Sequence, residues 1–346
     1  MRRHRIEAAR ERLLSSGDDR SAGGACSAII DAIQQVAPFD CAAVMTADPA
    51  TLLPTGGVFT ELDNSVCTPF WRSEAADDEL LRFSDLARSK AGVGTLAEIL
   101  PDGFEYSRRY REVFSAISLG DELRVVFQAG GACFGMASFV RADRGRAFSG
   151  DELDAVRQLT GSAVEILRED LIAPASRAIP EGPVTLAVDP EGQVVARTPG
   201  AQAVLADLTG AAIGAIALPP TVIAPIERVR ARPEAGPLIT RVRGLSGSWY
   251  RLCVSPFEDH PGHFALTIDP TRASDLTPIY LSSYGLTPRE IEVVSNLLRG
   301  LSAKEIAAEF DISTHTIRDH IKAIYQKIGV RSRGELHARF LHGSDF

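Results

Sequence analysis

The sequence predicts a multidomain protein in which two α+β domains precede an all-α domain of four short helices. The chain has 346 residues, more than one domain usually contains, and 45% of them are hydrophobic, which is enough for two or three cores. Stretches rich in proline and glycine divide it. Strand-like and helical patterns are mixed before residue 285, and beyond it the apolar residues recur only at helical spacing.

Residues 1–19 are predicted to form a basic N-terminal helix or arm. They contain five arginines together with Ile6, Leu13 and Leu14. A basic arm would add contacts to phosphates, but we favour an amphipathic helix that leads into the first domain or pairs with that of a second copy. Charged residues follow the basic start MRRHR where a secretory signal would be apolar, so no such signal is expected.

Residues 20–172 are predicted to form the first α+β domain. A helix begins near Ala25, a strand covers residues 41–45, and a polar helix is expected over residues 77–86. Two further strands, 122–129 and 133–140, form a hairpin around a Gly-Gly turn. A long helix with one apolar face follows Phe148 and closes the domain.

This order of helix, antiparallel sheet and closing helix resembles a GAF-type sensory domain. The most similar segments are FDCAAVMTADPATLLP and RADRGRAFSGDEL. The resemblance implies a small-molecule effector, of unknown identity, held between the sheet and its loops. No cofactor is identified from the residues themselves. The acidic cluster and βα alternation of a phosphoacceptor domain are missing, so control by phosphorelay is not expected.

Two features of this domain have both a chemical and a structural interpretation. Cys133, beside the glycine turn, is either a chromophore or redox anchor or a small core residue, and we favour the core residue. A polar cluster could clamp an anionic ligand, but a solvated helix face is the simpler interpretation. The cluster consists of Glu105, Tyr106, Arg108, Arg109, Tyr110 and Arg111.

Residues 173–182 are predicted to be a linker, because prolines and a glycine punctuate them. Residues 183–271 then form the second α+β domain, with two strands around the turn DPEG, a short helix over 201–208 and three antiparallel strands. This order resembles a small PAS-like domain. The uncharged run 208–226 contains three prolines, so we interpret it as domain interior and loop and not as a membrane span.

Two candidate sites in the second domain are interpreted structurally. Trp249 and Tyr250 are adjacent in a strand and point to opposite faces, so we expect one in the core and the other exposed or at an interface. His260 and His263 lie near Cys253, but three residues without a fourth ligand are a poor zinc set, and no metal is expected.

Residues 272–284 are predicted to be a linker long enough to permit relative motion, and residues 285–346 form the helical domain. Residues 311–313 are a connection so short that the helices on either side must pack at an angle. Each of the four helices begins at a residue that can cap it. These residues are Thr287, Ser302, Ser313 and Ser332.

The helical domain contains LT-x-RE-x-E, then GLS-x-KEIA, then IS-x-x-TI-x-x-H-x-x-x-I-x-x-K-x-G-V-x-SR-x-E. This pattern resembles the LuxR-type (GerE-like) helix-turn-helix domain of bacterial transcription regulators, over about 55 consecutive positions. The resemblance implies that Arg318, Asp319 and Lys322 reach the base edges of double-stranded DNA. The residues expected to contact phosphates or to dock the helix are Lys304, Ser313, Thr314, Thr316, His320 and Lys327.

The chemistry of these side chains supports part of this assignment. Arg318 and Lys322 can donate to guanine or to phosphate, and the helix that opens at Ser313 favours an anion at its start. Asp319 either accepts from cytosine N4 or pairs with Lys322, and we favour the pair. His320 lies off the basic stripe and is expected to pack or to contact phosphate.

The formal net charge of −8 is distributed unevenly. Residues 287–346 contain 9 Lys and Arg against 8 Asp and Glu, and the remaining residues contain 28 against 37. The acidity therefore belongs to the upstream domains. One copy carries so little positive charge that phosphate affinity should be modest, and a homodimer on a two-fold operator is expected.

The sequence thus predicts a cytoplasmic, one-component transcription regulator controlled by its upstream sensory domains. Five scattered cysteines fit a reducing compartment. No paired carboxylates, nucleophile elbow or phosphate loop stands out, so an enzyme is not expected. The alternative is a sensory or scaffold protein whose helical head mainly binds a protein partner such as RNA polymerase.

Overall fold

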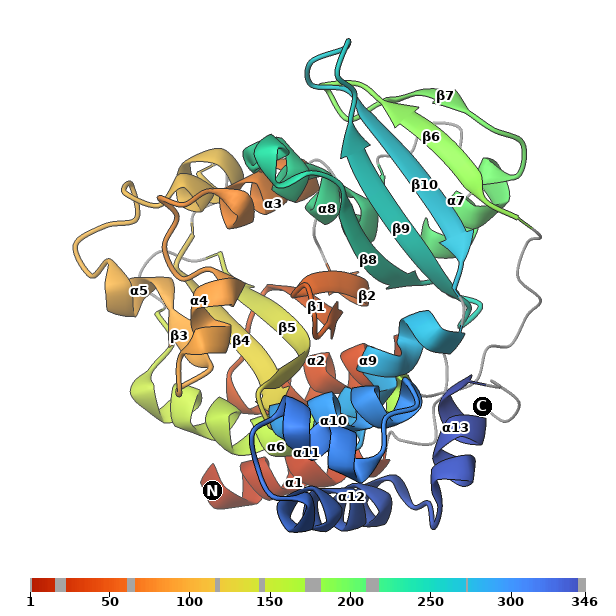
Figure 1. Cartoon of the computed structure of the whole chain (residues 1–346). Helices are drawn as coiled ribbons and strands as arrows, with labels where there is room; N and C mark the ends of the chain where they lie inside the picture. The colour runs from red at the N-terminus through yellow and green to blue at the C-terminus, as the bar shows by residue number, and fades with distance from the viewer. Residues whose placement is uncertain are drawn as a thin grey trace.

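The computed structural model confirms the order of two antiparallel sheets followed by a helical domain (Figure 1). It describes residues 2–15, 23–60, 66–115, 119–142, 147–171, 182–209, 218–271 and 273–341. The predicted linker 173–182 lies outside the described residues except at Gly182.

The first sheet has five antiparallel strands in the order β2-β1-β5-β4-β3. They are β1 (Cys41–Asp48), β2 (Leu53–Thr60), β3 (Val93–Thr95), β4 (Asp121–Ala129) and β5 (Ala132–Arg141). The predicted β4–β5 hairpin is confirmed, and its turn residues Gly130 and Gly131 have φ of 61° and 84°, which favours glycine. Strand β2 was not predicted, because Pro54, Gly56 and Gly57 interrupt its pattern, but an edge strand tolerates proline.

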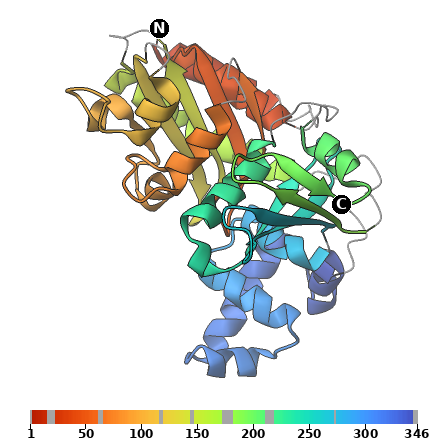
Figure 2. The same cartoon turned by 90° about the horizontal axis from the view of Figure 1, so that it is seen from above.

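Helices cover both faces of this sheet (Figures 1 and 2). One face packs against α2 (Gly24–Val36) and α6 (Gly150–Leu171), and α1 (Arg2–Ser15) lies on these two helices. The other carries α3 (Cys67–Ala75), α4 (Phe83–Arg88), α5 (Leu96–Ile99) and the π-helical turn η3 (Tyr110–Phe114). The polar helix predicted over residues 77–86 is wrong: this stretch is mostly loop between α3 and α4, with Leu81 at φ 54°.

The N-terminal segment is a helix of the first domain. In α1 the apolar side chains of Ile6, Ala9 and Leu13 are buried against α2 and α6. Arg10 donates to the carbonyl of Gln158, 3.0 Å away. These contacts agree with the amphipathic helix and not with an extended basic arm.

The second sheet is also antiparallel, with the order β7-β6-β10-β9-β8. Its strands are β6 (Val184–Val188), β7 (Val194–Arg197), β8 (Leu238–Arg243), β9 (Trp249–Pro256) and β10 (Phe264–Pro270). Its helices are α7 (Ala201–Thr209), α8 (Pro220–Ala231) and the short 3-10 turn η4 (Pro233–Ala235). Every strand predicted here is present, and so is the helix α7.

Residues 208–226 were predicted to be domain interior and loop; of these, 210–217 lie outside the described residues, and 220–226 are interior but form part of helix α8 and not a loop. Pro220 occupies the first helical turn, where a missing N–H costs nothing, and Pro225 is tolerated inside the helix. The helix is buried nearly all round, because it lies between the second sheet and α3 of the first domain. None of the helices within the described ranges has the length and hydropathy to span a bilayer.

The two α+β domains are packed edge to edge. Strand β8 lies beside β2, and α8 packs on α3. Arg72 Nε lies 3.2 Å from Glu227 Oε2, and Arg241 Nη1 lies 3.0 Å from Asp48 Oδ2. The carboxylates of Glu227 and Asp48 are almost fully buried, whereas Arg72 is 42% exposed and Arg241 is 17% exposed, so both ion pairs join the domains at the edge of the buried interface.

Trp249 and Tyr250 point to opposite sides of β9, and both are buried. Tyr250 packs in the core of the second domain and donates to Asp207 Oδ2 at 2.8 Å. Trp249 instead joins the core formed by the helices of the first domain. The interface position predicted for one of the two aromatic residues is therefore occupied by Trp249.

The segment predicted as the linker 272–284 forms helix α9 (Ala273–Ser283). Its residues Leu276 and Ile279 are buried in the core of the first domain, whereas Leu281 is buried in the core of the C-terminal domain. The guanidinium of Arg168, on α6, donates to the carbonyl of Ser283. Helix α9 therefore connects two hydrophobic cores.

Candidate nucleic-acid interface

Four helices form the C-terminal domain, and their starts were predicted correctly. They are α10 (Pro288–Leu298), α11 (Ala303–Glu309), α12 (Thr314–Ile328) and α13 (Arg333–Leu341). The side chain of Thr287 accepts from the Glu290 amide at 3.3 Å, and Glu290 in turn accepts from the Thr287 amide at 2.7 Å. Ser302 and Glu305 form the same reciprocal pair at α11.

The connection between α11 and α12 is short and sharply turned. Asp311 has φ 51°, a left-handed conformation that lets the chain reverse within one residue. Ala307 of α11 is buried in the core of the domain. On α12, Ile317 and Ile324 are completely buried on the face that packs against this core. This packing fixes which face of α12 points outward.

The outward face of α12 carries the three residues predicted to reach base edges. Arg318, Asp319 and Lys322 are all exposed. Ser313 caps the helix by accepting from the Thr316 amide at 3.1 Å, so the N-terminal end of α12 is ordered and also faces solvent. A helix with an exposed polar stripe, held at an angle to its neighbour, has the shape that enters the DNA major groove.

Asp319 does not pair with Lys322 in the structure. Its carboxylate lies 3.8 Å from Nε2 of His315, one turn earlier, and both side chains are highly exposed. The prediction chose the wrong intrahelical partner because both neighbours lie on the same side of a helix as Asp319. An exposed pair of this kind contributes little to stability, so Asp319 is accessible to a partner.

Lys327, in the last turn of α12, has a structural role. Its Nζ lies 2.6 Å from Glu290 Oε2, and the Glu290 side chain is almost fully buried. Burial alone would raise the pKa of Glu290, but the hydrogen bonds from Lys327 and from the Thr287 amide hold it below its ordinary value. Glu290 therefore both caps α10 and docks α12, a second role that the sequence analysis missed because its partner is 37 residues away.

Several basic residues of the domain donate hydrogen bonds to groups of the same domain. Arg333 donates to the Leu297 carbonyl at 2.7 Å, and Arg339 donates to the Ile328 carbonyl at 2.6 Å, so both cap helix ends. The remaining predicted contact residues differ in exposure: Lys304 and Thr316 are exposed, whereas Thr314 and His320 are half-buried. The surface that could meet phosphates is thus smaller than the sequence count of basic residues indicates.

Residues 284–339 match a family model described as bacterial regulatory proteins, luxR family. This segment is a LuxR-type helix-turn-helix domain. The chain is 40% identical over 70 residues to the probable HTH-type transcriptional regulator GfsR of Streptomyces halstedii, which is 20% of this chain and 27% of GfsR. It is 46% identical over 48 residues to the nitrate/nitrite response regulator protein NarP of Escherichia coli, 14% of this chain and 22% of NarP.

These matches span only about a quarter of each relative, so the likeness is that of the helix-turn-helix domain alone. A crystal structure of Escherichia coli SdiA aligns with 96% of this chain and 96% of its own, at 12% identity and a TM-score of 0.36. The GAF-like and PAS-like assignments of the upstream domains remain predictions.

Proposed function

We propose that the protein is a cytoplasmic transcription regulator that binds operator DNA through α12 under the control of its upstream domains. The observation that carries this proposal is the exposed stripe of Arg318, Asp319 and Lys322 on a helix that Glu290 and Lys327 dock from behind. The LuxR-type match over the same helices supports it. Arg318 and Lys322 supply donors for guanine O6 and N7, and Lys304 and Thr316 contact phosphates.

Binding as a homodimer follows from the small basic surface. Lys327, Arg333 and Arg339 bind groups of their own domain, so one copy neutralises few phosphates. Two copies on a two-fold operator double that number and read two half-sites. We therefore propose a dimer as the DNA-binding form.

Helix α9 is the proposed route by which the upstream domains act on the DNA-binding domain. Its residues pack in both cores, and Arg168 and Arg241 donate to its backbone carbonyls at Ser283 and Asp275. A signal that changes the packing of the first domain would change the position of α9 and hence of α12. A ligand acts in this way only if it binds one arrangement better than the other.

The test starts from a library of random DNA duplexes. Sequences retained by the full chain are selected, and the affinity for a selected and for a scrambled duplex is measured at several salt concentrations. We expect a preference of at least about 1,000-fold for the selected sequence, and a steep fall of affinity with salt. No preference at low salt would rule out the proposal, and would favour the alternative of a head that binds a protein partner.

A further inference from the structure

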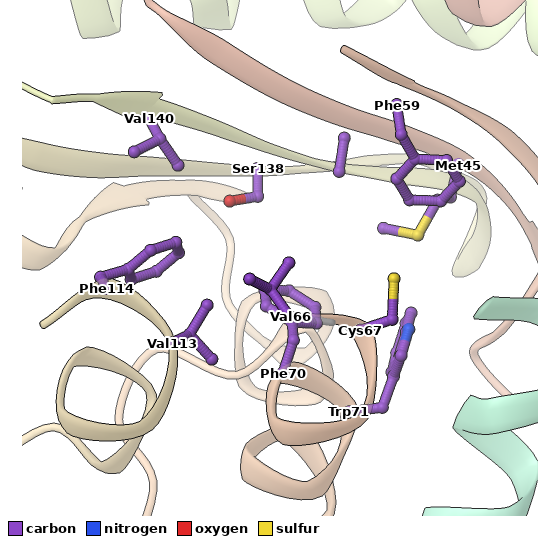
Figure 3. A pocket seen from close by; sticks show the side chains of 11 residues that line it. Met45, Phe59, Val66, Cys67, Phe70, Trp71, Val113, Phe114, Ser138 and Val140 are labelled. Atoms are coloured by element: carbon purple, nitrogen blue, oxygen red, sulfur yellow. The ribbon is translucent and has the colours of Figure 1, made fainter. Parts of the chain in front are cut away.

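The first domain encloses a cavity between its sheet and the helices α3 and η3 (Figure 3). About 530 Å³ of space lies in and in front of this cavity when the open solvent at its mouth is included, so the enclosed part is much smaller. Phe70, Trp71, Val113 and Phe114 form the helical side. Among the residues that the structure describes, those lining the cavity are all uncharged. They are Ala43, Met45, Phe59, Val66, Cys67, Phe70, Trp71, Val113, Phe114, Ser138 and Val140.

Ser138 is the polar group on the sheet side of this cavity, and a carboxylate on the same face of the sheet fixes its hydrogen-bonding state. Its Oγ lies 2.6 Å from Oε1 of Glu122. Burial alone would raise the pKa of Glu122, but Arg109, Arg124 and Ser138 together hold it below its ordinary value, so Glu122 is a carboxylate. A carboxylate only accepts, so Ser138 must donate its single proton to Glu122.

After this donation, Ser138 can act only as a hydrogen-bond acceptor. The hydroxyl proton is used by Glu122, and the two acceptor positions of Oγ are the ones available to a molecule in the cavity. In Figure 3 the Ser138 oxygen lies between the sheet and the aromatic side chains of the helices. A group that meets Ser138 there must therefore be a hydrogen-bond donor.

The charged side chains beside Ser138, on the same face of the sheet, pair with one another. Glu122 Oε2 accepts from Arg109 Nε at 2.7 Å, and the same buried network includes Glu74, Glu79 and Arg124. Arg228, which is half-buried, also attracts Glu74. These charges offset one another, and any ion that entered the apolar cavity would lose its hydration.

We propose that this cavity binds a small, uncharged and mainly apolar molecule that carries one hydroxyl or N–H group directed at Ser138. The aromatic and aliphatic side chains of α3, η3 and β1 hold its apolar body, and Ser138 selects for the donor. That this molecule is the signal for DNA binding rests on the proposed function, whereas its chemistry depends only on the cavity.

Trp71 provides a reporter inside the cavity. The chain contains two tryptophans, Trp71 and Trp249, and of the two it is Trp71 that lines the cavity. In the full-length variant Trp249→Phe the tryptophan emission comes from Trp71 alone. The phenyl ring that replaces the indole of Trp249 keeps an apolar group at the interface. Binding is then titrated without DNA, so the result does not depend on whether the protein binds an operator.

Four probes of matched size separate the chemistries. They are 4-butylphenol as the donor, 4-butylanisole as the acceptor without a donor, 4-butylbenzoate as the anion and 4-butylbenzylamine as the cation. We expect the phenol to bind about tenfold more tightly than the anisole, which is the value of one neutral hydrogen bond, and both ions to bind at least about 100-fold more weakly than the phenol. Equal binding of phenol and anisole, tighter binding of an ion, or no binding of the phenol up to its solubility would overturn the proposal.

Substitutions locate the selecting group. In the Trp249→Phe background, Ser138→Ala should abolish the preference for phenol over anisole, whereas Cys67→Ala, which removes the thiol from the same cavity, should preserve it. A preference that survives Ser138→Ala would overturn the role of Ser138. Should Ser138→Ala fail to fold, the comparison of the four probes on the Trp249→Phe protein still decides the ligand chemistry.

Discussion

The first and the last domains place their charged side chains in opposite ways. In the first domain the side chains of Arg109, Glu79 and Glu122 are completely buried, and Arg109 binds both carboxylates. In the C-terminal domain Arg318 and Lys322 are exposed and lie on the outer face of α12.

The difference separates two uses of charge. Buried charges that are fully paired hold a fixed geometry, and removing one partner leaves another unpaired in a medium that cannot solvate it. Exposed charges contribute little to stability, so they are available for recognition. The first domain thus uses charge to shape its interior, whereas the C-terminal domain presents charge to solvent on α12.

The largest effect is expected for Arg109→Met. Burial alone would lower the pKa of Arg109, but Glu122, Glu74 and Glu79 raise it, so it is a cation that three carboxylates share. Its removal should lower the free energy of unfolding by about 3–5 kcal/mol. Denaturant unfolding of the full chain measures this loss.

The control is the neighbouring Arg108, which pairs with Glu112 one turn away at 2.8 Å on a partly exposed surface. Arg108→Met should change the free energy of unfolding by no more than about 0.5 kcal/mol. Similar losses for the two variants would remove the contrast between buried and exposed charge.

Arg318→Ala tests the exposed side of the comparison. We expect the affinity for a selected operator to fall by about 1–3 kcal/mol, with relaxed preference at one base pair, and the free energy of unfolding to stay within about 0.5 kcal/mol. Duplex titrations and denaturant unfolding provide the two readings. As a control, Lys90→Ala removes an exposed charge from the first domain and should change neither the duplex affinity nor the free energy of unfolding. If Arg318→Ala lowers the affinity for all duplexes equally, Arg318 contacts phosphate and not a base.

Glu290 is a buried charged residue of the C-terminal domain, and Glu290→Gln tests what its charge contributes. Its carboxylate caps α10 and binds Lys327, so the variant should lose about 1–2 kcal/mol of stability at neutral pH. Because the folded pKa lies below the ordinary value of 4.5, this contribution is present above that pH and is lost as the pH falls through the lowered pKa. Unfolding of both proteins as a function of pH should therefore converge in acid, and a constant difference would exclude a role of the carboxylate charge.

The smallest effect is expected for Asp319→Ala. Its contact with His315 at 3.8 Å is highly exposed, so stability should change by less than about 0.5 kcal/mol. If α12 binds DNA as proposed, removing a negative charge from its exposed stripe should raise the affinity for all duplexes by about twofold. Loss of preference at a single base pair would instead identify Asp319 as a reader of cytosine.

The two domains also differ in how well the sequence predicted them. The C-terminal helices begin at Thr287, Ser302 and Ser313, whose side chains accept from the backbone three residues on. Such caps are local, so they can be recognised without the tertiary structure. The exposed stripe of α12 follows from the same helical periodicity.

The first domain is built from contacts that are distant in sequence. Arg109 was interpreted as part of a solvated surface, yet it is buried by Glu74, Glu79 and Glu122, which lie on other elements. Helix α3, which supplies Phe70 and Trp71 to the cavity, was not predicted either. Composition alone does not show which polar residues are paired inside a fold.

The helical nature of α9 has a consequence for the permitted length of the chain between the domains. A flexible linker tolerates an added residue, whereas each residue added to an α-helix rotates the downstream chain by about 100° and advances it by about 1.5 Å. The 11 residues of α9 therefore set the helical phase of the C-terminal domain relative to the upstream domains. A one-residue insertion there would turn α12 toward a different side of the molecule while leaving every residue of its exposed stripe unchanged.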